Sequence, residues 1–321
     1  MDYVTELMTR GGRLDDAAAL ADLFNTIDVA GGGHAGFTAD ELTGWLSAMV
    51  RDPATDSRLV TTADGTVVAA GLVPAPPEGG FRVDMFGGVH PDWRGRGVGR
   101  ELLTWQLART GELHGELAPG AHWEAETGAM FDDQVAHRMF ERFGFAPVRY
   151  FSEMVADTGP TATVALPDGL RCEAYRPEFE RALYDAHMEA FADHWGFQRR
   201  EFDAWVLITT RSRGFRAHLS RVAFDGDAIA GYVLGYADNS PDRVYIGQVG
   251  TRRPWRRRGL AGAMLDEVMV AAHADGLKFA GLGVDAANPT GAVGVYERVG
   301  FRVESRFVAF RKARLAVAAR R

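Results

Sequence analysis

The chain has 321 residues, a formal net charge of −7 and 46% hydrophobic residues. This length is enough for two domains of ordinary size, and the composition is enough for a hydrophobic core in each. The acidic balance argues against a general nucleic-acid binder, which needs a basic surface to meet phosphates.

The cysteine content and the first residues of the chain indicate the cellular compartment in which the protein works. A single cysteine, Cys172, allows no intramolecular disulfide and favours a reducing environment. No CxxC motif or His/Cys cluster is present, so we expect no metal site. The first residues lack the basic start of a signal peptide, and no run approaches the roughly 18 apolar residues of a membrane span. We therefore expect a cytoplasmic protein that works without a membrane.

In chain order, the first half predicts a strand near residues 4–8 and helices at 15–28 and 39–50. A strand pair follows around the Asp64-Gly65 turn, because Asp-Gly is a strong hairpin signal. The segments WRGRGVG and FERFGF come next, and Pro- and Gly-containing turns at about 157–168 then predict a linker.

The second half predicts the same kinds of element in the same order. A segment WRRRGLA at 255–261 joins a strand to an amphipathic helix, and YERVGF ends a later helix. The strands are predicted at 170–174, 221–224, 229–234, 244–249, 279–284 and 301–310, and the helices at 177–193, 199–208, from 260 and at 289–299.

Three landmarks recur in both halves: the Asp-Gly turn, the Arg-Gly segment and the Glu-Arg-x-Gly-Phe ending, spaced by about 160 residues. The chain is therefore predicted to be a tandem duplication, with an N-terminal copy at 1–156, a linker at 157–168 and a C-terminal copy at 169–321. Strands mixed with helices predict an α/β (α+β) fold in each copy, a mixed twisted sheet flanked by helices.

The Arg-Gly segments have the chemistry of a diphosphate site. The first amides of a helix are free and carry partial positive charge, glycine and alanine let an anion approach the backbone, and arginines add donors. Neither copy has the GxxxxGK[ST] loop of nucleoside triphosphate sites.

An Arg-x-x-Gly-x-Gly/Ala loop between a strand and a helix, followed by a Tyr-Glu-x-x-Gly-Phe ending, resembles the GCN5-related N-acetyltransferase (GNAT) superfamily. The tandem arrangement looks most like the mycothiol synthase type. The resemblance implies two GNAT folds, acetyl-CoA as co-substrate, and acetyl transfer to a small-molecule amine.

The resemblance also implies site residues in the C-terminal copy. Val249, Gly250 and Thr251 match the strand end that contacts pantetheine and the acetyl carbonyl, Asn288 matches a CoA contact, and Tyr296 matches the acid that protonates the leaving thiolate. The residues that match the pyrophosphate loop are Arg256, Arg257, Arg258, Gly259, Leu260, Ala261 and Gly262.

The N-terminal copy keeps the cofactor motif but has Phe140 where the other copy has Tyr296, and phenylalanine cannot donate a proton. We therefore expect it to bind CoA at most. The reverse assignment stays open, because some GNAT members work without that tyrosine. Its matching cofactor residues are Gly87, Gly88, Val89, Arg94, Gly95, Arg96, Gly97, Val98, Gly99 and Arg100.

The general base is left open. An alkyl amine with a pKa of about 10.4 is mostly ammonium at neutral pH, so a carboxylate or histidine must take its proton. The strand before the C-terminal loop offers no acid, and Asp193, His194 and Asp238 are the acceptor-site candidates. Cys172 is expected far from the loop, which favours direct transfer in a ternary complex over an acyl-cysteine relay.

Two rival functions remain at this level. One is a CoA-binding pseudoenzyme or sensor without turnover, and the other is a nucleotide-binding regulator, against which the missing loop lysine argues. The acceptor amine is not determined by the sequence, and a monomer or a simple homodimer is expected.

Overall fold

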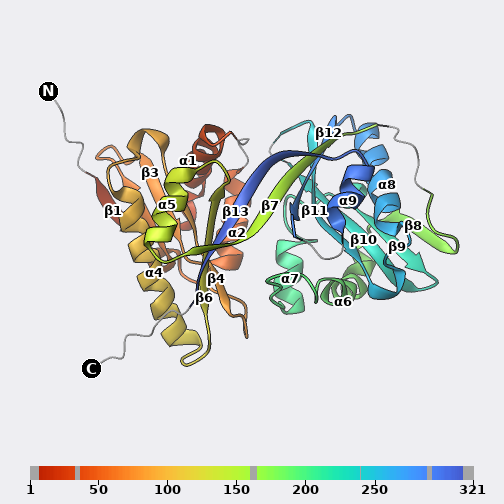
Figure 1. Ribbon diagram of the computed structural model, residues 1–321, viewed down its shortest axis with the longest axis horizontal. Helices are drawn as coiled ribbons and strands as arrows, with labels where there is room; N and C mark the ends of the chain where they lie inside the picture. Colours follow the sequence, from red (N-terminus) through yellow and green to blue (C-terminus); the bar gives the residue numbers. More distant parts are fainter. Residues whose placement is uncertain (1–6, 33–36, 160–164, 239, 288–290, 314–321) are drawn as a thin grey trace. The chain divides into compact units, whose positions relative to one another are not determined.

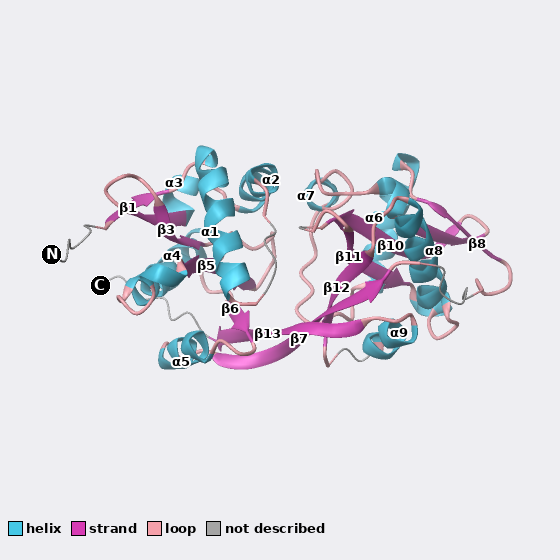
Figure 2. Ribbon diagram, turned by 90° about the horizontal axis from the view of Figure 1, so that it is seen from above, coloured by secondary structure: helices cyan, strands magenta, loops and turns pink. Residues whose placement is uncertain are grey.

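The computed structural model describes residues 7–32, 37–159, 165–238, 240–287 and 291–313 (Figure 1). These residues form two compact units. Unit 1 contains the residues up to 148 and those from 308, and unit 2 contains residues 149–307. In each unit, helices cover both faces of a sheet (Figure 2), as expected of an α/β fold, and unit 1 also contains strands of a second sheet.

In unit 1, side chains that alternate along the strands pack against helices on opposite faces of an antiparallel sheet with the order β1-β2-β3-β5. Leu59 and Ala70 face α1 and α2, whereas Val60 and Ala69 face α4. The elements are β1 Met8–Gly11, α1 Ala17–Ala30, α2 Ala39–Met49, α3 Pro53–Asp56, β2 Ser57–Thr61, β3 Val67–Leu72, β4 Arg82–Asp84, β5 Phe86–Val89, α4 Val98–Leu117, β6 Glu124–Met130 and α5 Gln134–Arg142.

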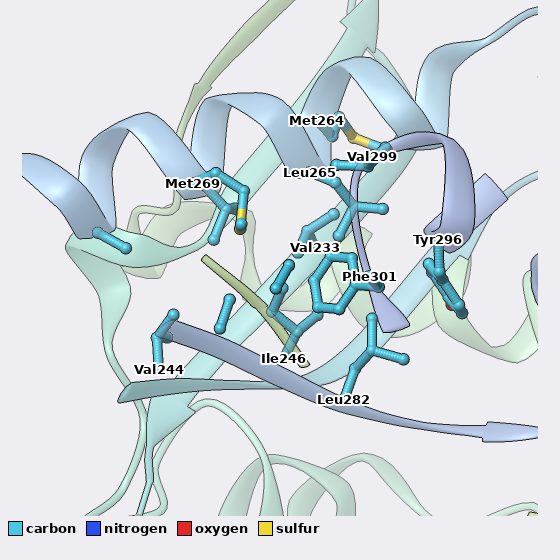
Figure 3. Packing of buried hydrophobic residues seen from close by; sticks show 14 of the residues in the cluster. Val233, Val244, Ile246, Met264, Leu265, Met269, Leu282, Tyr296, Val299 and Phe301 are labelled. Atoms are coloured by element: carbon cyan, nitrogen blue, oxygen red, sulfur yellow. The ribbon is translucent and has the colours of Figure 1, made fainter. Parts of the chain in front are cut away.

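Unit 2 has strands in the order β7-β12-β11-β10-β9-β8. One face carries α8 and α9 over the cluster in Figure 3, which includes Ile246 and Leu282, and the other face carries α6 and α7 over a second cluster, which includes Tyr232 and Leu234. The elements are β7 Ala146–Asp157, β8 Leu170–Ala174, α6 Glu180–Ala190, α7 Phe202–Ile208, β9 Arg221–Asp225, β10 Ala228–Ala237, β11 Arg243–Thr251, α8 Leu260–Ala274, β12 Phe279–Asp285, α9 Ala292–Arg298 and β13 Arg302–Ala313.

The last strands of the two copies are exchanged. β7 belongs to the N-terminal copy by sequence, yet its residues 151–157 pair antiparallel with β12 of the C-terminal copy. The end of β13, from the C-terminal copy, neighbours β6 in the sheet order, and its Val308 and Phe310 are buried in a unit 1 core with Phe140. The compact units therefore differ from the linear division at 1–156 and 169–321. That division, whose linker lies partly outside the described residues, stays a prediction about the repeat.

The fold class is confirmed, and the element predictions hold with small shifts. β8 has the predicted bounds, and β12 extends the prediction by one residue. The first strand lies at Met8–Gly11 instead of 4–8, with residues 4–6 outside the described range. α6 ends at Ala190 and α7 begins at Phe202, so the connection between them is longer than predicted.

Candidate active site

β11 and β12 run parallel but separate after a short contact. Their register pairs only Arg243 with Phe279, Val244 with Ala280 and Tyr245 with Gly281, although β11 continues to Thr251 and β12 to Asp285. The second half of β11 therefore has β10 on one side and an opening on the other.

The backbone of β11 is directed into this opening. Arg252 donates its N–H to the Ala230 carbonyl of β10 at 3.0 Å. Because successive residues of a strand direct their N–H groups to opposite sides, the N–H groups of Val249 and Thr251 point away from β10. They are placed to donate to an extended ligand, or to an oxygen that gains negative charge.

The loop that follows presents a second set of amides. Gly259 has φ +82°, which a glycine adopts without strain, and is the N-cap residue that precedes α8. The first intrahelical bond shown there runs from Ala263 N–H to the Gly259 carbonyl at 3.1 Å. The N–H groups of Leu260, Ala261 and Gly262 precede that bond and are unpaired within the helix. This is the geometry of a helix N-terminal anion site.

The arginines of the loop fall into two groups. The Arg256 guanidinium donates to the Thr251 and Ala190 carbonyls, both at 3.0 Å, and lies 3.2 Å from Asp193, so it holds the loop in place. Arg257 and Arg258 are exposed and make no hydrogen bond or ion pair with any other described residue. They are the two guanidiniums available to a diphosphate, and Arg257 adopts φ +61°, a conformation that only this non-glycine residue shows in the described chain.

The three acceptor candidates lie in unit 2, and each contacts another described side chain. Asp193 pairs with Arg253 at 2.6 Å as well as with Arg256, and hydrogen bonds from these guanidiniums lower the pKa of its carboxyl. Asp238 is 4% exposed at its side chain and lies 2.9 Å from Arg243. His194 stacks on Phe191 with ring centroids 5.3 Å apart.

We expect Asp193→Asn to weaken acetyl-CoA binding less than about fivefold, as is typical of exposed ion pairs, and to leave the pH dependence of turnover unchanged. The reason is that Asp193 anchors Arg253 and Arg256 and is not placed as a base. Calorimetric titration and a pH–rate profile measure both effects. Glu173→Gln, which breaks an exposed pair with Arg176, is the matched control. Loss of the acidic limb in Asp193→Asn would make Asp193 a base after all.

Tyr296 belongs to α9, on the face of the unit 2 sheet that carries α8 and α9. It belongs to the cluster that contains Leu282 and Val284 of β12, and Figure 3 shows it beyond Phe301 at one end of that cluster. Burial raises the pKa of Tyr296 to about 12, so the phenol holds its proton at neutral pH. Its hydroxyl makes no hydrogen bond to any other described residue.

The N-terminal copy has the same loop geometry. Gly95 and Gly97 have φ +77° and +89°, His90 donates to the Val68 carbonyl at 2.9 Å, and Arg94 bonds the Val89 carbonyl at 3.2 Å, as Arg256 does to Thr251. The other matching residues, Gly87, Gly88, Val98, Gly99, Arg96 and Arg100, lie on β5, in the loop and at the start of α4.

Phe140 of the N-terminal copy is a core residue. Its ring lies 6.1 Å from that of Phe145 and 5.4 Å from that of Phe310, and the residue is 7% exposed. Nothing in this position can protonate a thiolate.

Several further residues bear on the chemistry. Asn288 lies outside the described residues.

Burial raises the pKa of the Cys172 thiol to about 11, which disfavours a thiolate nucleophile. Among the described residues, no group of three or more His, Cys, Asp or Glu side chains could hold a metal ion, and no described helix is both long and apolar enough to cross a membrane.

Sequence reasoning missed two side chains at the opening, Glu153 of β7 and Gln248 of β11. Glu153 is partly buried beside Gly283 of β12, and burial raises its pKa. The Gln248 Oε1 atom is buried and has no hydrogen-bond partner among the described residues. Glu153 could not have been found from the repeat, because its strand belongs to the other copy by sequence.

Comparisons with known proteins agree with this geometry. Residues 176–301 match the acetyltransferase (GNAT) family and residues 55–147 match an acetyltransferase (GNAT) domain. A mycothiol acetyltransferase of Salinispora tropica is 31% identical over 92% of this chain and 94% of its own length, and one of Thermobispora bispora is 29% identical over 76% and 80%.

Solved structures are similar over the whole chain. A GCN5-related N-acetyltransferase from Sphaerobacter thermophilus superimposes with a TM-score of 0.78 at 30% identity, covering 96% of this chain and 95% of its own. A tandem GNAT protein from the clavulanic acid biosynthesis pathway has a TM-score of 0.73 at 17% identity, covering 96% and 98%, and shows the fold alone. The chain therefore belongs to the GCN5-related N-acetyltransferase family, as a tandem GNAT enzyme.

Proposed function

We propose that the C-terminal copy transfers the acetyl group of acetyl-CoA to a small-molecule primary amine by direct attack in a ternary complex. The observation that supports this most is the alignment of three features along one path. These are the edge of β11 beyond its pairing with β12, the helix N-terminal amides of Leu260, Ala261 and Gly262, and the guanidiniums of Arg257 and Arg258, which have no partner among the described residues.

Each feature fits one section of acetyl-CoA. The diphosphate lies on the loop amides with Arg257 and Arg258, the pantetheine arm adds to the free edge of β11, and the thioester carbonyl accepts from a strand amide such as that of Val249. The amine attacks the thioester carbon, CoA leaves as a thiolate, and Tyr296 gives that thiolate its proton. The N-terminal copy binds CoA at most, because Phe140 has no hydroxyl with which to protonate a thiolate.

The test is acetyl transfer by the full chain, followed by mass spectrometry of the products. The amines are the desacetyl form of mycothiol, chosen because several relatives are named mycothiol acetyltransferase, together with a polyamine, an aminoglycoside and an amino acid ester. Acetylation of at least one amine that depends on acetyl-CoA is the expected result. Tight acetyl-CoA binding with no acetylated amine would favour a CoA-binding protein without turnover.

A further inference from the structure

Groups that can accept a proton lie on the face of the unit 2 sheet opposite Tyr296. Along β12, Leu282 and Val284 point into the cluster under α8 and α9, so Gly281 and Gly283 face the side of α6 and α7. On β11, Tyr245 and Gln248 are cross-strand partners of Tyr236 and Leu234, which pack under α6 and α7. Both side chains therefore share the face of Gly283.

Glu153 reaches the same place from β7. Met154 points into the α8 and α9 cluster, so its neighbour Glu153 points to the α6 and α7 face. Glu153 is paired with Gly283, two residues beyond the last contact between β11 and β12. A β carbon on Gly283 would lie 2.8 Å from Glu153 Oε1 and 3.2 Å from the Tyr245 hydroxyl, so the two oxygens flank one point above this glycine.

We propose that Glu153, supplied by the N-terminal copy through the exchanged strand, is the base that removes the proton from the acceptor ammonium in the C-terminal site. This inference rests on the proposed acetyl transfer, for which Glu153 would be the general base. The absence of a side chain at Gly283 leaves room for the carboxylate, and the buried Gln248 Oε1 offers a further acceptor to an N–H group of the amine.

The surroundings of Glu153 suit a base. Its carboxylate makes no hydrogen bond or ion pair with any other described residue, and burial raises its pKa. The charged and titratable groups that act on it are Arg243 and Tyr245 of β11, Glu304 of β13 and Asp238 of the preceding turn. Arg243 lowers the pKa, whereas Glu304 and Asp238 raise it.

Glu153 and Tyr296, on opposite faces of the sheet, together account for the protons of the reaction. The ammonium gives one proton to Glu153, and the neutral amine forms the C–N bond as the thioester carbonyl becomes an oxyanion. When the C–S bond breaks, the thiolate takes the Tyr296 proton and the nitrogen loses its second proton, which returns through solvent to the tyrosine. One proton per turnover is released in total, from Glu153.

The experiment measures kcat/KM of the full chain from pH 6 to 10 with the amine that gives turnover. Glu153→Gln should reduce it about 100-fold at pH 7. The loss should shrink as the pH approaches the pKa of the amine, about 10.4 for an alkyl amine, because the amine then deprotonates in solution. Glu153→Asp, which keeps a carboxylate, should be intermediate and retain the acidic limb of the profile.

Glu304→Gln is the matched control, because it removes a carboxylate that also interacts with Arg243. It should stay within about threefold of wild type, and all variants should bind acetyl-CoA within about twofold of wild type. Glu153→Gln should also be no less stable at pH 7, since it removes a buried charge with a raised pKa.

A Glu153→Gln enzyme with the wild-type rate and pH profile would overturn the assignment while leaving acetyl transfer intact. A wild type that acetylates none of the amines would contradict the proposed function and this inference with it.

Discussion

Tyr296→Phe is expected to lower kcat by about 100-fold or more, within the range of 10² to 10⁴ typical of a general acid, and to leave acetyl-CoA affinity nearly unchanged. Phenylalanine keeps the ring that packs in the cluster of Leu282 and Phe301, so only the proton donor is lost. Steady-state kinetics and calorimetric titration separate the two effects.

The raised pKa of Tyr296, about 12, shapes this prediction. A phenol of that pKa is a poor donor to a thiolate in water, where a cysteine thiol has a pKa of about 8.5. Burial raises the pKa of both groups, so a thiolate expelled into the same apolar site is a stronger base than in water. When the pKa of the CoA thiol is raised in this way, the difference between it and the pKa of the Tyr296 phenol becomes smaller. Because Tyr296 keeps its proton well above neutral pH, kcat should show no loss from tyrosine ionisation below about pH 10.

Phe140→Tyr is the reciprocal control for the N-terminal copy. An added hydroxyl should gain no turnover, because the base proposed for the reaction, Glu153, lies beside Gly283 of the C-terminal copy. A Tyr296→Phe enzyme with unchanged kcat would instead mean that the thiolate leaves without this acid, or that turnover takes place in the N-terminal copy.

The local elements and the cofactor loop could be predicted because their signals are local. The Asp225-Gly226 turn determines the β9 and β10 hairpin, and β8 has the predicted bounds. The glycine before α8 takes the left-handed conformation that the motif requires, with φ +82° at Gly259. Each of these features depends on residues that are neighbours in the sequence.

The strand exchange and the proposed base could not be predicted in the same way. Pairing between β7 and β12 is made by backbone groups, which any strand of suitable length provides, so nothing in the side chains assigns β7 to either copy. Glu153 therefore looked like a residue of the N-terminal copy. The ion pairs of Asp193 could not be predicted either, because its partners Arg253 and Arg256 are more than fifty positions away in the sequence.

Gly259→Glu is expected to weaken acetyl-CoA binding by at least about 100-fold. A non-glycine residue in a left-handed conformation costs about 1–2 kcal/mol, and a carboxylate at the helix N-terminus competes with the diphosphate for the amides of Leu260 and Ala261. A β carbon at Gly259 would meet no other atom within 4 Å, so the substitution disturbs the anion site and not the core. Calorimetric titration with acetyl-CoA measures the loss.

Gly97→Glu is the control, because it makes the same change at the matching position of the N-terminal copy. The two glycines have φ +82° and +89°, so the backbone cost is nearly equal and cancels when the variants are compared. If the C-terminal copy holds the working site, Gly97→Glu keeps turnover near wild type while Gly259→Glu abolishes it. The opposite pattern would place acetyl transfer in the copy that has Phe140, and the proton for the leaving thiolate would then come from another group or from water.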